Sequence, residues 1–69
     1  MDLKAIVLNI DGTLLNDQKV ITPRTRESLL RAQEAGVKLV LASGRPLPAM
    51  LKFSNELKME HYHGLLLSN

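Results

Sequence analysis

The stretch that decides the fold reads Ala5-Ile6-Val7-Leu8-Asn9-Ile10-Asp11-Gly12-Thr13-Leu14-Leu15. An apolar run ends in two polar residues one position apart, followed by glycine and threonine. In a strand, residues i and i+2 point to the same side, so Asn9 and Asp11 can converge at the carboxyl end of a strand over residues 3–9. Open α/β sheets bind their ligands at this end of their strands. The sequence therefore predicts a buried strand that ends at a functional site.

Composition narrows the class of protein. The chain has 69 residues, 45% of them hydrophobic and 23% charged, with no cysteine and a formal net charge of +2. These values are typical of a globular protein, and the lack of cysteine fits a reducing compartment. Basic residues alternate with acidic ones, and a single Phe and a single Tyr offer little surface for stacking bases. No apolar run approaches the roughly 18 residues that cross a membrane. We expect a cytoplasmic protein that binds neither nucleic acid nor membrane.

Helix and strand patterns alternate along the rest of the chain. Thr22 and Pro23 are typical of an N-cap and a first helical residue, and Gly36 is typical of a left-handed helix end. The predicted elements are a strand over 3–9, a small hairpin or flap over 14–21, a helix over 23–35, a strand over 37–42, a helix from about 46 to 58 and a strand over 64–67. Strands that alternate with helices indicate right-handed βαβ units and a parallel sheet.

The second predicted helix has an apolar face. Its members are expected to pack on the sheet, and they are Leu47, Met50, Leu51, Phe53 and Leu57.

Polar residues follow each of the three predicted strands. They are Asn9, Asp11, Gly12 and Thr13 after the first, Ser43, Gly44, Arg45 and Pro46 after the second, and Ser68 and Asn69 after the third. Ser43 and Gly44 at a helix N-terminus would suit a phosphate group, and Asp11 would serve as a general acid/base or line a Mg²⁺ site. Taken singly, Ser43 is an ordinary N-cap and Asp11 a turn former. Their placement at equivalent strand ends favours one shared site.

Two of these segments resemble a known family. Residues 9–15 resemble the first motif of the haloacid dehalogenase-like phosphatases, Asp-x-Asp-Gly-Thr-Leu-Leu, and residues 41–46 resemble their second. Residues 64–69 look like the third strand of the Cof-type branch, which carries a type-two cap. The resemblance implies a partial Rossmann-like, three-layer α/β fold. Residues 1–69 would be the N-terminal part of the core domain, ending where the cap domain would start.

The resemblance also implies roles for individual residues. Position 9, here Asn9, is an aspartate in the family that attacks phosphorus and forms an aspartyl-phosphate. Asp11 would protonate the leaving oxygen and then activate water, and the side chain at position 9 and the backbone carbonyl of Asp11 would bind Mg²⁺. Ser43 and Gly44 would hold the phosphoryl oxygens, with Arg45 and Asn69 near the substrate entrance. The substrate would be a small phosphorylated metabolite, such as a sugar phosphate.

Two departures from the family pattern lead us to expect that this chain is inactive alone. Asn9 has no nucleophilic carboxylate, and the later lysine and acidic motifs of the family are absent. The alternative function is a non-catalytic phosphate-binding or interaction module with a degenerate site. An unrelated doubly wound binding domain, such as a flavodoxin-like receiver, is disfavoured by the two motifs.

We further expect an apolar edge at the first strand and a bare sheet face, and hence association with the missing C-terminal part or with a second copy.

Overall fold

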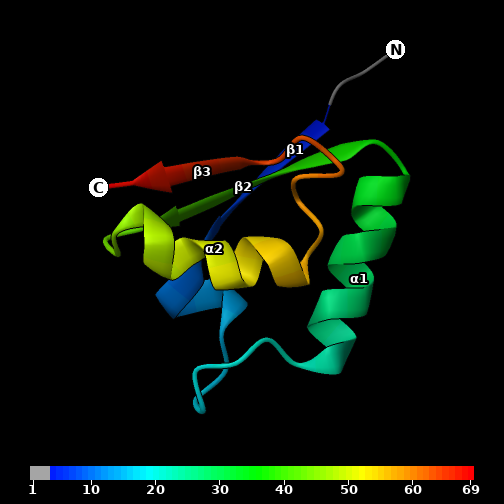
Figure 1. The fold of residues 1–69 in the computed structure, drawn as a ribbon. Coiled ribbons are helices and arrows are strands. Elements are labelled where there is room, and N and C mark those ends of the chain that lie inside the picture. The colour runs from blue at the N-terminus through cyan, green and yellow to red at the C-terminus, as the bar shows by residue number, and fades with distance from the viewer. Residues whose placement is uncertain (1–3) are drawn as a thin grey trace.

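The computed structural model describes residues 4–69, so Leu3, the predicted start of the first strand, lies outside the described residues. Strands and helices alternate as predicted (Figure 1). In chain order the elements are β1 (Lys4–Asn9), the π-helical turn η1 (Ile10–Leu14), α1 (Pro23–Glu34), β2 (Val37–Ser43), α2 (Leu47–Glu56) and β3 (Leu65–Ser68).

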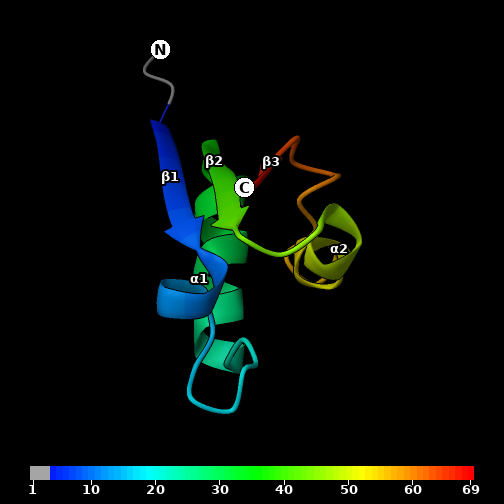
Figure 2. The same cartoon turned by 90° about the vertical axis from the view of Figure 1, so that its left-hand side faces the viewer.

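The three strands form one parallel sheet in the order β1-β2-β3. Leu41 of β2 lies between Leu8 of β1 and Leu66 of β3, and Ser43 lies beside Ser68. All three strands run in the same direction, so their carboxyl ends open on one edge of the sheet (Figure 2). The predicted meeting of the three polar strand ends at one edge is therefore confirmed.

Both helices cover the same face of the sheet (Figure 1). Successive right-handed crossovers that move in one direction across a sheet place their helices on one side. The core between the layers consists of Ile10, Leu14, Leu15, Ile21, Leu39, Leu41, Met50, Phe53, Leu57 and Met59. The described residues thus form two layers of the expected three-layer fold.

The opposite sheet face carries no helix among residues 4–69, and apolar side chains are exposed on it. Val7, Val40 and Leu65 are neighbours in register across the three strands. Val7 is 64% exposed and Leu65 54%, whereas Val40 between them is buried. The predicted bare face and the open edge at β1 are both present.

Local signals in the sequence explain the ends of α1. The Thr22 hydroxyl accepts a hydrogen bond from the Thr25 backbone N–H at 3.2 Å, and Pro23 takes the first helical position. Gly36 has a φ of 99°, in the region that favours glycine, as predicted for the residue that ends this helix.

The second helix differs from the prediction in two ways. It begins at Leu47, with Pro46 as its N-cap, so Ser43 is the last residue of β2 and not a helix N-cap. Leu47 and Leu51 are both 50% exposed and do not join the core, so their predicted place on the inner face is wrong. Met50 and Phe53 fill the space against the sheet, and Leu47 and Leu51 lie toward solvent.

The segment between β1 and α1 is not a two-stranded hairpin. After η1, a turn over residues 16–20 closes through a bond from the Asn16 backbone N–H to the Val20 carbonyl, at 3.0 Å. The Asn16 side chain accepts from the backbone N–H groups of Gln18 and Val20. Buried Leu15 and Ile21 flank this turn and attach it to the core.

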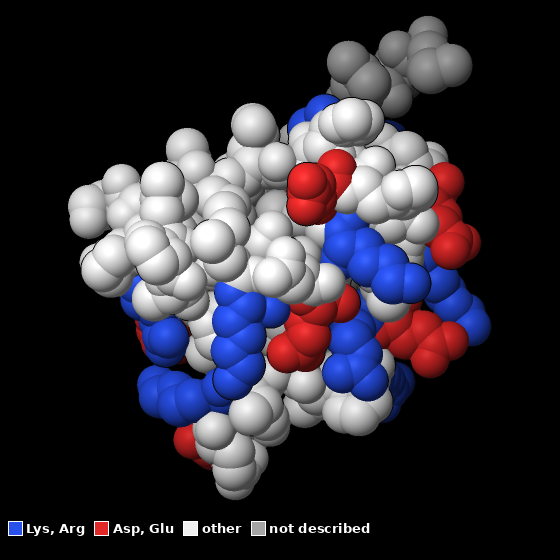
Figure 3. Space-filling model, viewed as in Figure 1, with Lys and Arg blue, Asp and Glu red and all other residues white. Residues whose placement is uncertain are grey.

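Charge is distributed unevenly on the surface (Figure 3). In this view, charged side chains gather over α1, and the opposite side, over β3 and the start of α2, is free of charge. Across residues 4–69, no helix has the length and apolar character needed to cross a membrane.

Candidate phosphate site at the strand ends

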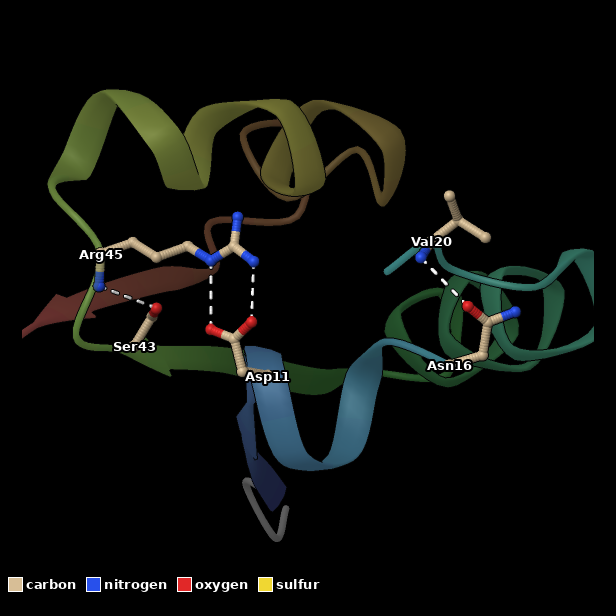
Figure 4. A network of polar contacts seen from close by, with 5 residues as sticks. All are labelled: Asp11, Asn16, Val20, Ser43 and Arg45. Atoms are coloured by element: carbon tan, nitrogen blue, oxygen red, sulfur yellow. Dashed lines mark hydrogen bonds and ion pairs between the residues drawn. The ribbon is translucent and has the colours of Figure 1, made fainter. Parts of the chain in front are cut away.

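The centre of the site is a bidentate ion pair between Arg45 and Asp11 (Figure 4). Arg45 Nη2 donates to Asp11 Oδ1 at 2.7 Å, and Arg45 Nε donates to Asp11 Oδ2 at 3.1 Å. Asp11 lies in η1 after the first strand, and Arg45 lies in the loop after the second. A planar guanidinium matches the two oxygens of a carboxylate, so this pairing is both strong and directional.

The ion pair shifts the pKa of both partners. Hydrogen bonds from Arg45 lower the pKa of Asp11 below its ordinary value; desolvation opposes this shift, and the positive charges of Arg45 and Lys19 reinforce it. The hydrogen bonds to Asp11 raise the pKa of Arg45. Asp11 is therefore held as a carboxylate, which suits a base or an acceptor. To act as an acid, it would first have to leave Arg45.

The backbone of Arg45 is attached to both neighbouring strands. Its N–H donates to the Ser43 hydroxyl of β2 at 3.0 Å, and its carbonyl accepts from the Ser68 hydroxyl of β3 at 2.7 Å. Ser43 is buried, and after accepting this bond its own O–H proton can still reach a ligand. Arg45 thus connects residues at the carboxyl ends of all three strands.

Gly44 and Asn69 complete the edge. Gly44 is exposed between Ser43 and Arg45, and a Cβ there would meet nothing within 4 Å. The Asn69 backbone N–H donates to the Ser43 carbonyl at 2.9 Å, which extends the β2–β3 pairing by one residue. The structure therefore places Asn69 beside Ser43 at the edge.

Asn9 is the exposed last residue of β1, next to Ala42 in register. Within residues 4–69, no hydrogen bond of its side chain is found. The chain leaves the strand at Ile10, so Asp11 does not occupy a strand position and the predicted i, i+2 alignment with Asn9 does not apply. The Asp11 side chain is oriented by Arg45 instead.

Two contributors, Phe53 and Lys19, were absent from the predicted site, and the role of a third, Ser68, was not predicted. Ser68 anchors the Arg45 loop, Phe53 lies under the Arg45 guanidinium at 5.4 Å from its ring centroid, and Lys19 adds positive charge near Asp11. A polar residue at the third strand end was a signal for Ser68. The other two come from a helix core position and a turn, where the sequence carries no sign of the site.

The donor set at this edge is poor for a divalent cation. Mg²⁺ prefers several oxygen ligands, usually including carboxylates. The predicted ligands are the backbone carbonyl of Asp11 and the neutral amide of Asn9, and the carboxylate of Asp11 is already bound by Arg45 on both oxygens. In the described part of the chain, no three His, Cys, Asp or Glu side chains gather to hold a metal. These residues do not by themselves fit a Mg²⁺ site.

Comparisons with known proteins identify relatives of this chain. The chain is 34% identical over 62 residues to 5-amino-6-(5-phospho-D-ribitylamino)uracil phosphatase YcsE of Bacillus subtilis, covering 90% of this chain and 25% of that protein. It is 38% identical over 60 residues to pyridoxal phosphate phosphatase YbhA of Escherichia coli, covering 87% of this chain and 22% of that protein. The chain thus spans about a quarter of the length of the curated relatives it matches.

A solved structure and a family profile complete the comparison. The crystal structure of a haloacid dehalogenase-like hydrolase from Bacteroides thetaiotaomicron superposes with a TM-score of 0.93 at 51% identity, covering 97% of this chain and 25% of that one. Residues 6–69 match the profile described as haloacid dehalogenase-like hydrolase. The resemblance of the two motifs is thereby confirmed, and the chain belongs to the haloacid dehalogenase-like hydrolase family.

Proposed function

We propose that residues 1–69 are the N-terminal part of the core domain of a phosphatase that hydrolyses small phosphorylated metabolites. The observation that carries this proposal is that Arg45 connects three strand ends through hydrogen bonds with Asp11, Ser43 and Ser68. A hydroxyl, a guanidinium and a carboxylate at one edge are groups that position a phosphoryl group and stabilise its charge. The phosphorylated compounds in the names of two relatives support the substrate class.

The proposal gives a role to each residue of the site. Ser43 and the Gly44 amide hold the phosphoryl oxygens, and Arg45 neutralises the charge that builds on them. Asp11, once released by Arg45 and protonated from solvent, gives this proton to the leaving oxygen, and the resulting carboxylate later takes a proton from the attacking water. Asn69 lies at the entrance, where a substrate would be oriented.

Position 9 decides whether the chain can form the covalent intermediate. The family's aspartyl-phosphate requires a carboxylate there, and the Asn9 amide is not a competent nucleophile. We therefore expect covalent catalysis to fall by orders of magnitude with Asn9.

Mg²⁺ is proposed only for a complete protein. Asn9 and Asp11 would contribute two oxygen ligands, and carboxylates outside the described residues would have to supply the rest. The roles proposed above for Ser43, Arg45 and Asp11 do not involve the metal. A cytoplasmic location is part of the same proposal, because it fits the phosphorylated metabolites and the cysteine-free sequence.

A non-catalytic phosphate-binding module is the second candidate. Asn9 favours it, because this residue removes the nucleophile and leaves the Ser43 and Arg45 groups in place. Such a module would bind a phosphate group reversibly and release it unchanged.

A chimaeric enzyme separates the two candidates. Residues 1–69 would replace the corresponding quarter of the Bacteroides hydrolase, to which they are 51% identical. The chimaera would be assayed on p-nitrophenyl phosphate with and without Mg²⁺, as Asn9 and as Asn9→Asp. We expect Mg²⁺-dependent turnover in Asn9→Asp, and a rate lower by orders of magnitude with Asn9.

A matched control places the same change elsewhere. Asn55→Asp, on the exposed surface of α2, adds an identical carboxylate away from the site and should leave the chimaera inactive. A folded Asn9→Asp chimaera without activity would contradict the enzyme and favour the module.

A further inference from the structure

We propose that the Arg45–Asp11 ion pair is a latch that closes the phosphate site when no ligand is bound. A phosphate group opens it by taking the Arg45 guanidinium away from Asp11. This inference rests on the proposed function, because it concerns how the same edge admits its ligand.

The first support is that Asp11 occupies one of the two sides of the Arg45 guanidinium that can bind a phosphate through two hydrogen bonds. Arg45 Nη2 and Nε point along one side of the guanidinium, and both are bound to the carboxylate. Phosphate and carboxylate oxygens make the same two-pronged arrangement with arginine. The two anions must therefore compete for this side of the guanidinium.

The second support is that both partners are accessible. The Arg45 side chain is 33% exposed and the Asp11 side chain is 48% exposed. A ligand arriving at the strand ends can therefore reach the pair without any rearrangement of the core, and opening requires only rotation of side chains.

The third support is the contrast between the backbone and the side chain of Arg45. Hydrogen bonds to the hydroxyls of Ser43 and Ser68 fix the backbone on both sides of the residue. The side chain beyond this point is long, and its guanidinium packs over the Phe53 ring. Because its backbone is fixed and its side chain is long, Arg45 can change partners by side-chain rotation. Ser43 lies next to it and can bind the same ligand.

Lys19 makes release of Asp11 less costly. Its positive charge acts on Asp11 from the turn over residues 16–20, and it would still do so after Arg45 has left. The freed carboxylate would thus keep one favourable charge nearby and be available for proton transfer in the proposed reaction.

The latch predicts how phosphate affinity responds to substitution. The chimaera that carries residues 1–69 would be titrated with inorganic phosphate by two-dimensional NMR, with these residues as wild type, Asp11→Asn, Arg45→Gln and the double variant. Asp11→Asn should bind phosphate about tenfold more tightly, since apparent affinity scales with the fraction of protein whose site is open. Arg45→Gln should lose most of the binding.

The double variant distinguishes a latch from general repulsion between anions. With a latch, Asp11→Asn improves affinity only when Arg45 is present; with repulsion, the gain persists in the Arg45→Gln background. Asp17→Asn, a change of equal charge at an exposed position of the neighbouring turn, should leave affinity unchanged. In wild type, phosphate should also move the carboxyl ¹³C resonance of Asp11, a readout that needs no variant.

The outcomes separate the two proposals. Equal phosphate affinity in wild type and Asp11→Asn, or a gain that survives in the double variant, would overturn the latch and leave the phosphate site standing. Failure of phosphate to bind either protein would overturn the phosphate site, and the latch with it.

Discussion

Arg45 binds both carboxylate oxygens of Asp11 although 34 positions separate the two residues in the sequence. The contact joins the turn after β1 to the loop after β2, and the hydroxyl of Ser68 ties the same loop to β3. One arginine thus holds together the carboxyl ends of three strands. The site is built on this arrangement, and its electrostatics can be measured directly.

The first prediction concerns the acid titration of Asp11. Arg45 lowers the pKa of Asp11 below its ordinary value of 3.8, so Arg45→Gln should raise it again. Because the pKa of Asp11 is lower in the folded state than in the unfolded state, the ion pair stabilises the fold at pH values above the ordinary pKa. That contribution is lost as the pH falls through the lowered pKa. Carboxyl ¹³C NMR from pH 2 to 6 (about the range of interest for Asp) would follow the titration.

Arg24→Gln is the matched control for this measurement. Arg24 is an exposed arginine of α1, so its loss removes the same charge without touching the ion pair. If Arg24→Gln moved the pKa of Asp11 as far as Arg45→Gln does, the direct hydrogen bonds would not be the cause.

The parallel sheet and the common edge followed from residue patterns, because burial of apolar runs and right-handed crossovers leave few alternatives. The Thr22 cap and the left-handed Gly36 followed from local backbone chemistry. The Arg45–Asp11 pair did not, since it depends on the path of a loop and on the reach of one long side chain. The exposed positions of Leu47 and Leu51 were missed because helical spacing alone does not say how wide the buried stripe is.

The second prediction concerns Gly64, which precedes β3. A Cβ at this position would lie 2.6 Å from Met59 Cε and 3.0 Å from both Met59 Cβ and the Leu39 carbonyl. The methionine end can move, but the carbonyl belongs to the central strand. Gly64→Ala should therefore lower the free energy of unfolding by about 1–3 kcal/mol, measured by urea denaturation. Gly44→Ala, where the added methyl group meets nothing within 4 Å, serves as the control.

The third prediction concerns Gln33, a buried amide of α1. Its Nε2 donates to the Leu57 carbonyl at 2.7 Å, which joins α1 to the end of α2, and its Oε1 has no partner among the described residues. Gln33→Met keeps the volume and leaves the carbonyl unpaired. The unpaired carbonyl destabilises the fold, but the substitution also removes the buried oxygen that has no partner. The free energy of unfolding should therefore fall by only about 1 kcal/mol. Gln18 is exposed and serves as the control. If Gln18→Met lowered the free energy of unfolding as much as Gln33→Met, the hydrogen bond of Gln33 would not be the cause.

The fourth prediction is that the 69-residue chain self-associates. β1 is an edge strand, and Val7 and Leu65 are mostly exposed on the face without helices. An open strand edge beside an apolar patch favours association between copies. Sedimentation equilibrium should therefore show a mass that rises with concentration. Val7→Lys or Leu65→Lys should weaken association about tenfold or more, because a charge placed in the contact costs at least about 1.4 kcal/mol.

Val20→Lys tests whether the sheet face itself is responsible. Val20 is 47% exposed, but it lies in the turn before α1 and not on the sheet, so its substitution adds the same charge at a distance from the contact. If Val20→Lys weakened association as much as Val7→Lys, net charge and not the face would control it. A chain that stays monomeric at all concentrations and melts in one sharp two-state transition would show that the bare face and the open edge can be tolerated in water.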